Sequence, residues 1–235
     1  MQLNWYYFIS LLFTFWCLRH FKETNLEIKQ QFLIRLSTLN IFTYLFNLYY
    51  FTKFAPILTL LPLQLCNIGV ILIPYALKTY KKELIEFLFY VCGLGALSAI
   101  LIVSKEYQDT YSLFTLSFYT FHFLIFLIPT LLWRWGFCKI DPHLKTAYRL
   151  TLILIVLSLF IHSINLLLNA FDVPANYFFT IIEYSIKSND AFKFFASIIP
   201  FDYFYLYLIF PILYGYMVLV YLFLKFRKHH KQVPL

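Results

Sequence analysis

Apolar residues run in long unbroken stretches along the chain, and short polar segments separate them. Stretches of this kind match the roughly 17–25 residues that a helix needs to cross the hydrocarbon core of a bilayer. The pattern predicts an all-α, polytopic membrane helical bundle that forms a single transmembrane domain over residues 1–235. We expect about seven transmembrane helices, at roughly 4–18, 32–52, 55–77, 84–104, 112–133, 149–170 and 203–224.

The first apolar stretch, 4–18, is short for a span and resembles a secretion signal in length. It has no Lys or Arg before it and no small-residue cleavage motif after it, and a signal peptide carries both. We therefore count it as a membrane span.

The longest connection between spans is 171–202, which we expect to form an outer loop. Four apolar side chains of this loop fall on one side of a helix drawn over 190–199: Phe192, Phe195, Ile198 and Ile199. The spacing predicts an amphipathic helix that lies on the outer membrane surface. The alternative is an ordinary ordered loop.

Composition supports the membrane assignment. The chain is 62% hydrophobic and 13% charged, with a mean hydropathy of +0.73, whereas soluble domains are about a quarter charged. A water-soluble fold of 235 residues has no means of hiding so much apolar surface. The net charge of +8 therefore indicates loop residues of a multi-pass cell-membrane protein, and we expect no nucleic-acid partner.

Lys and Arg are distributed unequally between alternate connections. The first, third and fifth loops and the C-terminal tail hold 15 of these residues, and the N-terminus and the remaining loops hold 4. Cytoplasmic loops are the ones enriched in Lys and Arg. The count predicts an N-terminus outside and a C-terminus in the cytoplasm.

Polar side chains recur at helical spacing inside the apolar stretches. Two sets each share one helix face: Asn40, Tyr44 and Asn47 in the second span, and Ser158, His162, Asn165 and Asn169 in the sixth. Polar groups are costly in hydrocarbon, so such residues are candidates for a functional site. The alternative is hydrogen bonding that holds the helices together.

Cys66 and His122 are singled out because their expected depths agree. Cys66 lies about eleven residues into the third span, and His122 about ten into the fifth. At 1.5 Å per residue, both lie about 15 Å below the outer boundary. The sixth span runs the other way, so His162 and Asn165 fall in its outer half. We expect these four residues to converge in one cavity that opens toward the outer leaflet.

A cysteine and a histidine within reach of each other form an activated nucleophile, in which the thiol attacks and the imidazole takes the proton. A neighbouring amide stabilises the oxyanion that develops on an ester carbonyl. We therefore take Cys66 and His122 as catalytic candidates. The candidates for binding or orienting the substrate are Gln64, Asn67, His162, Asn165, Asn169 and Tyr119.

The other cysteines give no sign of a metal site. Cys17, Cys92 and Cys138 are scattered along the chain without ligand spacing or a disulfide framework. We interpret them as small buried apolar residues. No cofactor and no metal are expected.

Several strings occur in an order that resembles a known family: LPLQLCN at 61–67, EFLFYVCGLGAL at 86–97, FYTFHFLI at 118–125, and INLLLNA with NYFF at 164–179. The chain is similar to the YwaF-like bacterial integral membrane proteins and to the eukaryotic transmembrane protein 164 group. The likeness covers about residues 30–225. The family's cysteine falls on Cys66 and its histidine on His122, and Gln64 stands where the family often has histidine.

Members of the eukaryotic group are described as phospholipid acyltransferases that use such a Cys and His. The resemblance thus implies a lipid acyltransferase or transacylase that moves a fatty acyl chain between membrane lipids through a Cys66 thioester. A phospholipid or lysophospholipid is then the expected partner. Two alternatives remain: a small transporter or ligand-binding bundle whose polar stripes line a pocket, and a purely structural subunit.

Overall fold

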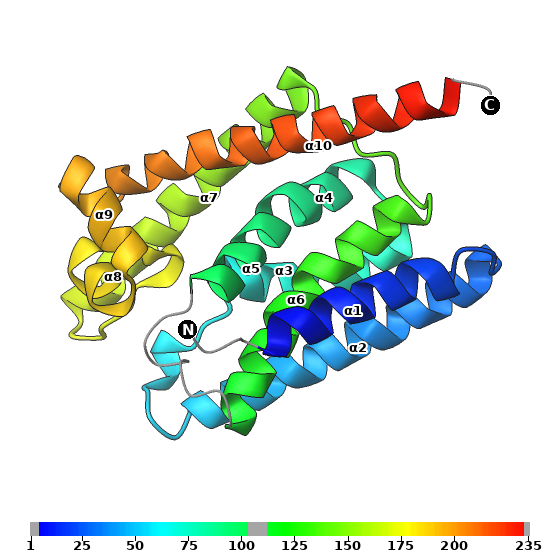
Figure 1. The fold of residues 1–235 in the computed structure, drawn as a ribbon. Helices are drawn as coiled ribbons and strands as arrows, with labels where there is room; N and C mark the ends of the chain where they lie inside the picture. Colours follow the sequence, from blue (N-terminus) through cyan, green and yellow to red (C-terminus); the bar gives the residue numbers. More distant parts are fainter. Residues whose placement is uncertain (1–4, 103–111, 233–235) are drawn as a thin grey trace.

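The computed structural model describes residues 5–102 and 112–232, the last six of these by their backbone alone, and the described residues form helices without any strand. Figure 1 shows the arrangement. In chain order the elements are α1 Trp5–His20, α2 Leu26–Phe51, η1 Ile57–Thr59, α3 Leu65–Thr79, α4 Lys82–Phe87, η2 Leu88–Cys92, α5 Gly93–Leu101, α6 Leu113–Arg134, α7 Leu144–Ala170, η4 Tyr177–Phe179, α8 Ile182–Ser188, α9 Asp190–Ile198, η5 Phe204–Leu208 and α10 Ile209–Gln232.

Helix α6 lies at the centre of the bundle. Helices α1, α2, α3 and α5 all pack against it. Leucine and isoleucine fill the contacts on its C-terminal half, and five of these side chains are inaccessible to solvent: Ile125, Leu127, Ile128, Leu131 and Leu132. Apolar residues on nearly every face make α6 a core helix rather than a one-sided amphipathic one.

Helices α7 and α10 form an outer layer beside this bundle (Figure 1). Only 22% of the apolar window of each is buried, against 67% for α6. The fully buried residues of α7 lie toward its two ends, and none falls between Thr151 and Phe160. Both helices therefore present long apolar faces that suit contact with lipid chains.

Four helical segments within the described ranges are long and apolar enough to cross a membrane: Lys82–Leu101, Leu113–Arg134, Leu144–Ala170 and Phe204–Phe226. These agree with four of the predicted spans, although residues 103 and 104 of the span 84–104 lie outside the described residues. Helix α3 is apolar but has only 15 residues. The full set of seven spans and the orientation of the termini stay predictions.

The predicted third span, 55–77, is wrong in its first ten residues. The chain from Thr52 to Gln64 is irregular apart from η1, and α3 begins at Leu65. Pro56 and Pro62 explain the difference, since proline has no N–H to donate and restricts the residue before it to extended conformations. Cys66 is therefore the second residue of α3, and the depth of eleven residues expected for it does not hold.

The predicted helix within the loop 171–202 is confirmed as α9, and Asn189 caps its start by accepting from the Ala191 N–H at 2.8 Å. Its apolar face is divided differently from the prediction. Phe192 packs inward, with its ring 4.6 Å from that of Phe179, whereas Phe194 and Ile198 are exposed. The position of α9 on the outer membrane surface stays a prediction.

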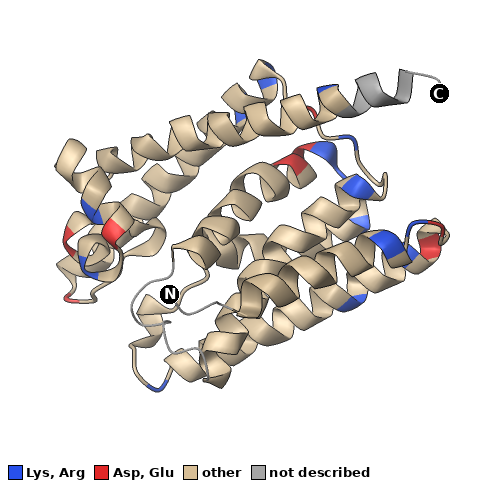
Figure 2. Ribbon diagram, in the orientation of Figure 1, with Lys and Arg blue, Asp and Glu red and all other residues tan. Residues whose placement is uncertain are grey.

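Basic residues gather at one end of the molecule, where α1, α3 and α6 end (Figure 2). A buried carboxylate joins the two layers there. Glu86 of α4 is fully buried and pairs with Lys82 at 3.6 Å, as expected from their one-turn spacing. It also pairs with Arg149 of α7 and accepts from the Asp141 N–H at 3.1 Å. This cluster fastens α7 to α4.

Replacing Arg149 by leucine should destabilise the protein by about 3–5 kcal/mol, because it leaves the Glu86 carboxylate buried without its closest cation. Thermal unfolding in detergent measures this effect. The double variant Glu86→Leu, Arg149→Leu removes both charges and should recover most of the lost stability. A single variant that unfolds at the wild-type temperature would contradict the pairing described here.

Candidate functional site

Cys66 lies in the first turn of α3, after Gln64 at the N-cap position. Its side chain is half-buried and packs against the main core. The first-turn N–H groups of a helix have no partners within the helix and carry partial positive charge, which favours negative charge beside them. The thiol is thus held at a helix end rather than in the middle of a span.

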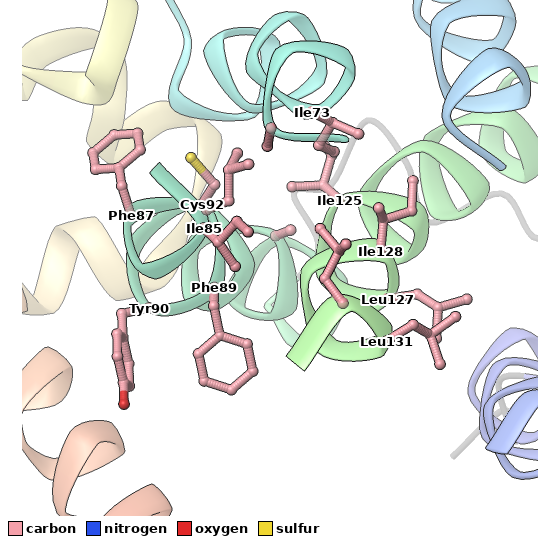
Figure 3. Packing of buried hydrophobic residues seen from close by; sticks show 14 of the residues in the cluster. Ile73, Ile85, Phe87, Phe89, Tyr90, Cys92, Ile125, Leu127, Ile128 and Leu131 are labelled. Atoms are coloured by element: carbon pink, nitrogen blue, oxygen red, sulfur yellow. The ribbon is translucent and has the colours of Figure 1, made fainter. Parts of the chain in front are cut away.

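Helix α3 reaches α6 through a glycine. A Cβ atom at Gly69 would lie 3.4 Å from Cγ2 of Ile125 and 3.3 Å from Cβ of Cys92, so no larger residue fits without displacing a neighbour. Figure 3 shows Ile125 and Cys92 in this contact region, with the sulfur of Cys92 directed toward α3. The absence of a side chain at Gly69 lets α3, η2 and α6 pack closely against one another.

The close approach sets the relative level of Cys66 and His122. Helices α3 and α6 run in the same direction, because the segments that follow them are joined by an ion pair between Lys82 and Asp141 at 3.5 Å. Cys66 precedes Gly69 by three residues on α3, and His122 precedes Ile125 by three on α6. Residues three apart share a helix face. We therefore infer that Cys66 and His122 lie in one layer, one turn from the contact.

His122 is held in one tautomer by its own helix. Its Nδ1 lies 2.8 Å from the carbonyl oxygen of Phe118. A carbonyl only accepts hydrogen bonds, so in the neutral ring Nδ1 carries the proton and Nε2 keeps the lone pair. The ring is 92% buried and packs beside Phe118 and Phe121, with centroid distances of 4.2 and 4.9 Å. His122 is thus an oriented acceptor of protons.

A single π-helical turn, η2, carries Cys92 into the same region. Cys92 is fully buried, and its Sγ lies 3.4 Å from the Cβ position of Gly69. Turns of this type often mark functional sites. All four cysteines are free thiols, and the described residues contain no group of three His, Cys, Asp or Glu side chains that could hold a metal ion.

The polar face of α7 binds the loop 171–202. Asn165 is fully buried and its amide is fully used: Nδ2 donates to the Tyr177 carbonyl and to Thr180 Oγ1, both at 2.8 Å, and Oδ1 accepts from the Tyr177 N–H at 2.9 Å. His162 Nδ1 lies 2.9 Å from the same Thr180 oxygen. Asn169 Nδ2 donates to the Ala175 carbonyl at 2.7 Å. These bonds explain the spacing of the stripe.

The loop in turn contacts the start of α3. Gln64 accepts from the Phe178 N–H at 3.0 Å and donates to the Asn176 carbonyl at 3.3 Å. Tyr177 donates through its hydroxyl to the Leu58 carbonyl at 2.6 Å and accepts from the Leu61 N–H at 3.0 Å. Burial raises the pKa of this hydroxyl, so Tyr177 stays a donor. The loop therefore fixes the segment that leads to Cys66.

The loop backbone is unusual where it makes these contacts. Phe178 and Phe179 have φ values of 57° and 55°, and Tyr203, which follows the loop, has 65°. Bulky residues in this region cost about 1–3 kcal/mol each and persist only where surrounding contacts enforce them. The strain lies next to Gln64 and hence next to the start of α3.

The candidate site residues thus divide into two groups. Cys66 and His122 share a layer, with Asn67 half-buried beside Cys66 in the first turn. Tyr119 is buried one turn before His122, and its ring stacks on that of Tyr6 at 4.6 Å. The second group comprises Gln64, His162, Asn165 and Asn169, whose hydrogen bonds go to the loop. Through the loop, these four residues support the segment that leads to Cys66. The common cavity expected from the sequence is not what their hydrogen bonds form.

Sequence reasoning missed Thr180, whose hydroxyl accepts a hydrogen bond from Asn165 and is also bonded to His162. It is fully buried. A single threonine in the loop 171–202 has no pattern that distinguishes it. Only the spacing of the α7 stripe, which requires a polar partner near the C-terminal end of α7, gave a signal.

Substituting valine for Gly69 should push α3 away from α6 and separate Cys66 from His122. Overpacking of this kind costs about 1–3 kcal/mol, and a displacement of about 1 Å at reacting groups lowers a rate by about 10²-fold. Gly215→Val is the matched control, since a Cβ there meets nothing within 4 Å. Turnover and thermal unfolding should fall only in the first variant; equal behaviour of the two would contradict the close approach.

A family model described as the TMEM164 family matches residues 1–225, which is nearly the whole chain. No curated protein and no solved structure matches the chain.

Proposed function

The chain belongs to the TMEM164 family of membrane proteins, and from this we propose that it is a membrane-embedded lipid acyltransferase or transacylase. Cys66 is the nucleophile and His122 the general base. The observation that carries the proposal is the shared layer of Cys66 and His122 beside Gly69, together with the free Nε2 that the Phe118 carbonyl leaves on His122.

The first half-reaction forms a thioester. The Cys66 sulfur attacks the carbonyl carbon of a lipid ester while its proton passes to Nε2 of His122. The tetrahedral intermediate then expels the alcohol oxygen, which takes the proton back from His122 and leaves as a lysolipid. The S–C bond replaces the C–O bond, and His122 returns to its neutral tautomer.

The second half-reaction reverses these roles. The hydroxyl of an acceptor lysolipid gives its proton to His122 and attacks the thioester carbonyl, and the Cys66 sulfur leaves and is reprotonated. An ester forms, a thioester breaks, and no oxidant or cofactor is consumed. Water in place of the acceptor would give a free fatty acid, so exclusion of water from the surroundings of Cys66 and His122 favours transfer.

The surroundings of the pair support a lipid substrate. The layer lies among apolar helices, and α7 and α10 present exposed leucine, isoleucine and phenylalanine side chains along most of their length. A lipid approaches such a site laterally within the bilayer, whereas a water-soluble donor would have to leave water. Phospholipid and lysophospholipid are therefore the proposed donor and acceptor.

Acyl exchange between labelled lipids tests the proposal. The protein is reconstituted with a diacyl phospholipid carrying an isotope-labelled chain and with an unlabelled lysophospholipid, and lipid mass spectrometry follows the label. The proposal predicts a labelled diacyl product made from the acceptor. Label found only in free fatty acid would indicate a hydrolase, and no movement of label above the Cys66→Ala background would contradict the proposal.

A further inference from the structure

Asn40 of α2 has a fully buried side-chain amide without a hydrogen-bond partner among the residues that the structure describes. Its exposure is 0%, and neither Nδ2 nor Oδ1 is bonded to another group. Asn165, equally buried, uses the same two atoms in three bonds. An unsatisfied buried polar group costs about 1–3 kcal/mol, and each such group in a folded protein requires an explanation.

The packing of α2 on α6 gives the level of Asn40. The rings of Tyr50 and Phe114 stack at 4.4 Å, and those of Tyr44 and Phe121 lie 5.9 Å apart, so the two helices run antiparallel. Asn40 is one turn before Tyr44 on α2, which places it beside the turn that follows Phe121 on α6. That turn, residues 122–125, begins with His122.

The same face of α2 carries further polar groups toward its outer end. Asn47 is two turns from Asn40 and its Oδ1 is also buried and unbonded. Tyr44 lies between them. The unbonded Asn40 amide and Asn47 Oδ1 of this stripe differ from the amides of the α7 stripe, which are hydrogen-bonded to the loop. The difference indicates that the α2 stripe has a partner other than the protein.

We propose that the Asn40 amide donates its hydrogen bond to the carbonyl oxygen of the acyl ester and stabilises the oxyanion formed when Cys66 attacks. The inference rests on the proposed function, and adds a catalytic residue to it. An ester carbonyl accepts hydrogen bonds and brings no donor of its own, so it matches the unbonded Nδ2. An oxyanion donor acts most strongly where water is excluded, as at a fully buried position.

The test distinguishes the rate at which a lipid ester acylates Cys66 from the general reactivity of the Cys66 thiol. Wild-type protein and the near-isosteric variant Asn40→Leu are treated with a short-chain phospholipid, and acyl-Cys66 is followed by peptide mass spectrometry. Parallel samples receive N-ethylmaleimide, whose reaction with the thiol forms no oxyanion on an ester. Thr38→Val, at an exposed position of the same helix, is the control.

We expect Asn40→Leu to slow acylation by about 10²–10³-fold, while maleimide labelling of Cys66 and the unfolding temperature stay at or above wild-type values. Thr38→Val should match the wild type throughout. Acylation of Asn40→Leu at the wild-type rate would overturn the role of Asn40 and leave the proposed function standing. A parallel loss of acylation, labelling and stability would make Asn40 a packing residue. Absence of acyl-Cys66 in the wild type would overturn both proposals.

Discussion

Replacing Cys66 by alanine should abolish acyl transfer, with a loss on the order of 10⁴-fold or more, because the acyl chain then has no sulfur to bind. His122→Phe should lose about 10²–10⁴-fold, the usual contribution of a general base. Phenylalanine keeps the ring packing between Phe118 and Phe121 and removes only Nε2 and Nδ1. Initial rates of lipid exchange in reconstituted vesicles measure both effects.

Cys92→Ala is the matched control for this series. Cys92 is fully buried, lies beside Gly69 and is also a free thiol. It lies at the end of the π-helical turn and not at the start of α3, so its removal should leave most of the transfer rate. If Cys92→Ala were inactive and Cys66→Ala active, the nucleophile would be the other thiol of the pair.

Asn165→Leu is expected to have a large effect on stability. The substitution leaves the Tyr177 N–H and the Tyr177 carbonyl without their partner, while the Thr180 hydroxyl keeps its contact with His162 Nδ1. Each unsatisfied buried group costs about 1–3 kcal/mol. We therefore expect a loss of about 3 kcal/mol or more, measured as the unfolding temperature in detergent. The loop should loosen first, which increases hydrogen exchange at residues 175–181.

The comparison with Asn40→Leu makes this prediction specific. Both residues are fully buried asparagines, but of the two only Asn165 has a side-chain amide that makes hydrogen bonds. Leucine at position 40 removes two unsatisfied groups and should not lower stability, whereas leucine at 165 creates two, the N–H and the carbonyl of Tyr177. Equal losses of stability in the two variants would contradict the hydrogen-bond assignment of the α7 stripe.

The apolar stretches predicted most of the helices, because a helix in a bilayer requires a length of apolar residues that the sequence displays directly. The third span failed for a local reason: apolar residues continue through 55–64, but Pro56 and Pro62 stop them from forming a helix. Hydropathy alone cannot separate an apolar helix from an apolar irregular segment packed beneath a loop.

The site was predictable only in part. The predicted depth of Cys66 within a span was wrong, because α3 begins at Leu65. The common level of Cys66 and His122 stays a prediction, which the close approach of Gly69 to Ile125 supports. The α7 stripe was recognised as polar, but its partners are mainly backbone groups of the loop, which have no residue type to reveal them. The unbonded amide of Asn40 is likewise visible only after packing is known.

The central claim is that Cys66 carries the acyl chain between lipids. Protein incubated with a phospholipid of known chain, quenched in acid and digested, gives a Cys66 peptide whose mass reports the modification. We predict a peptide heavier by that acyl group, sensitive to hydroxylamine, and lost on addition of excess lysophospholipid acceptor. Two results together would contradict the claim that Cys66 carries the acyl chain. Label would move between lipids while the Cys66 peptide stayed unmodified at every time point, and the exchange would be undiminished in Cys66→Ala.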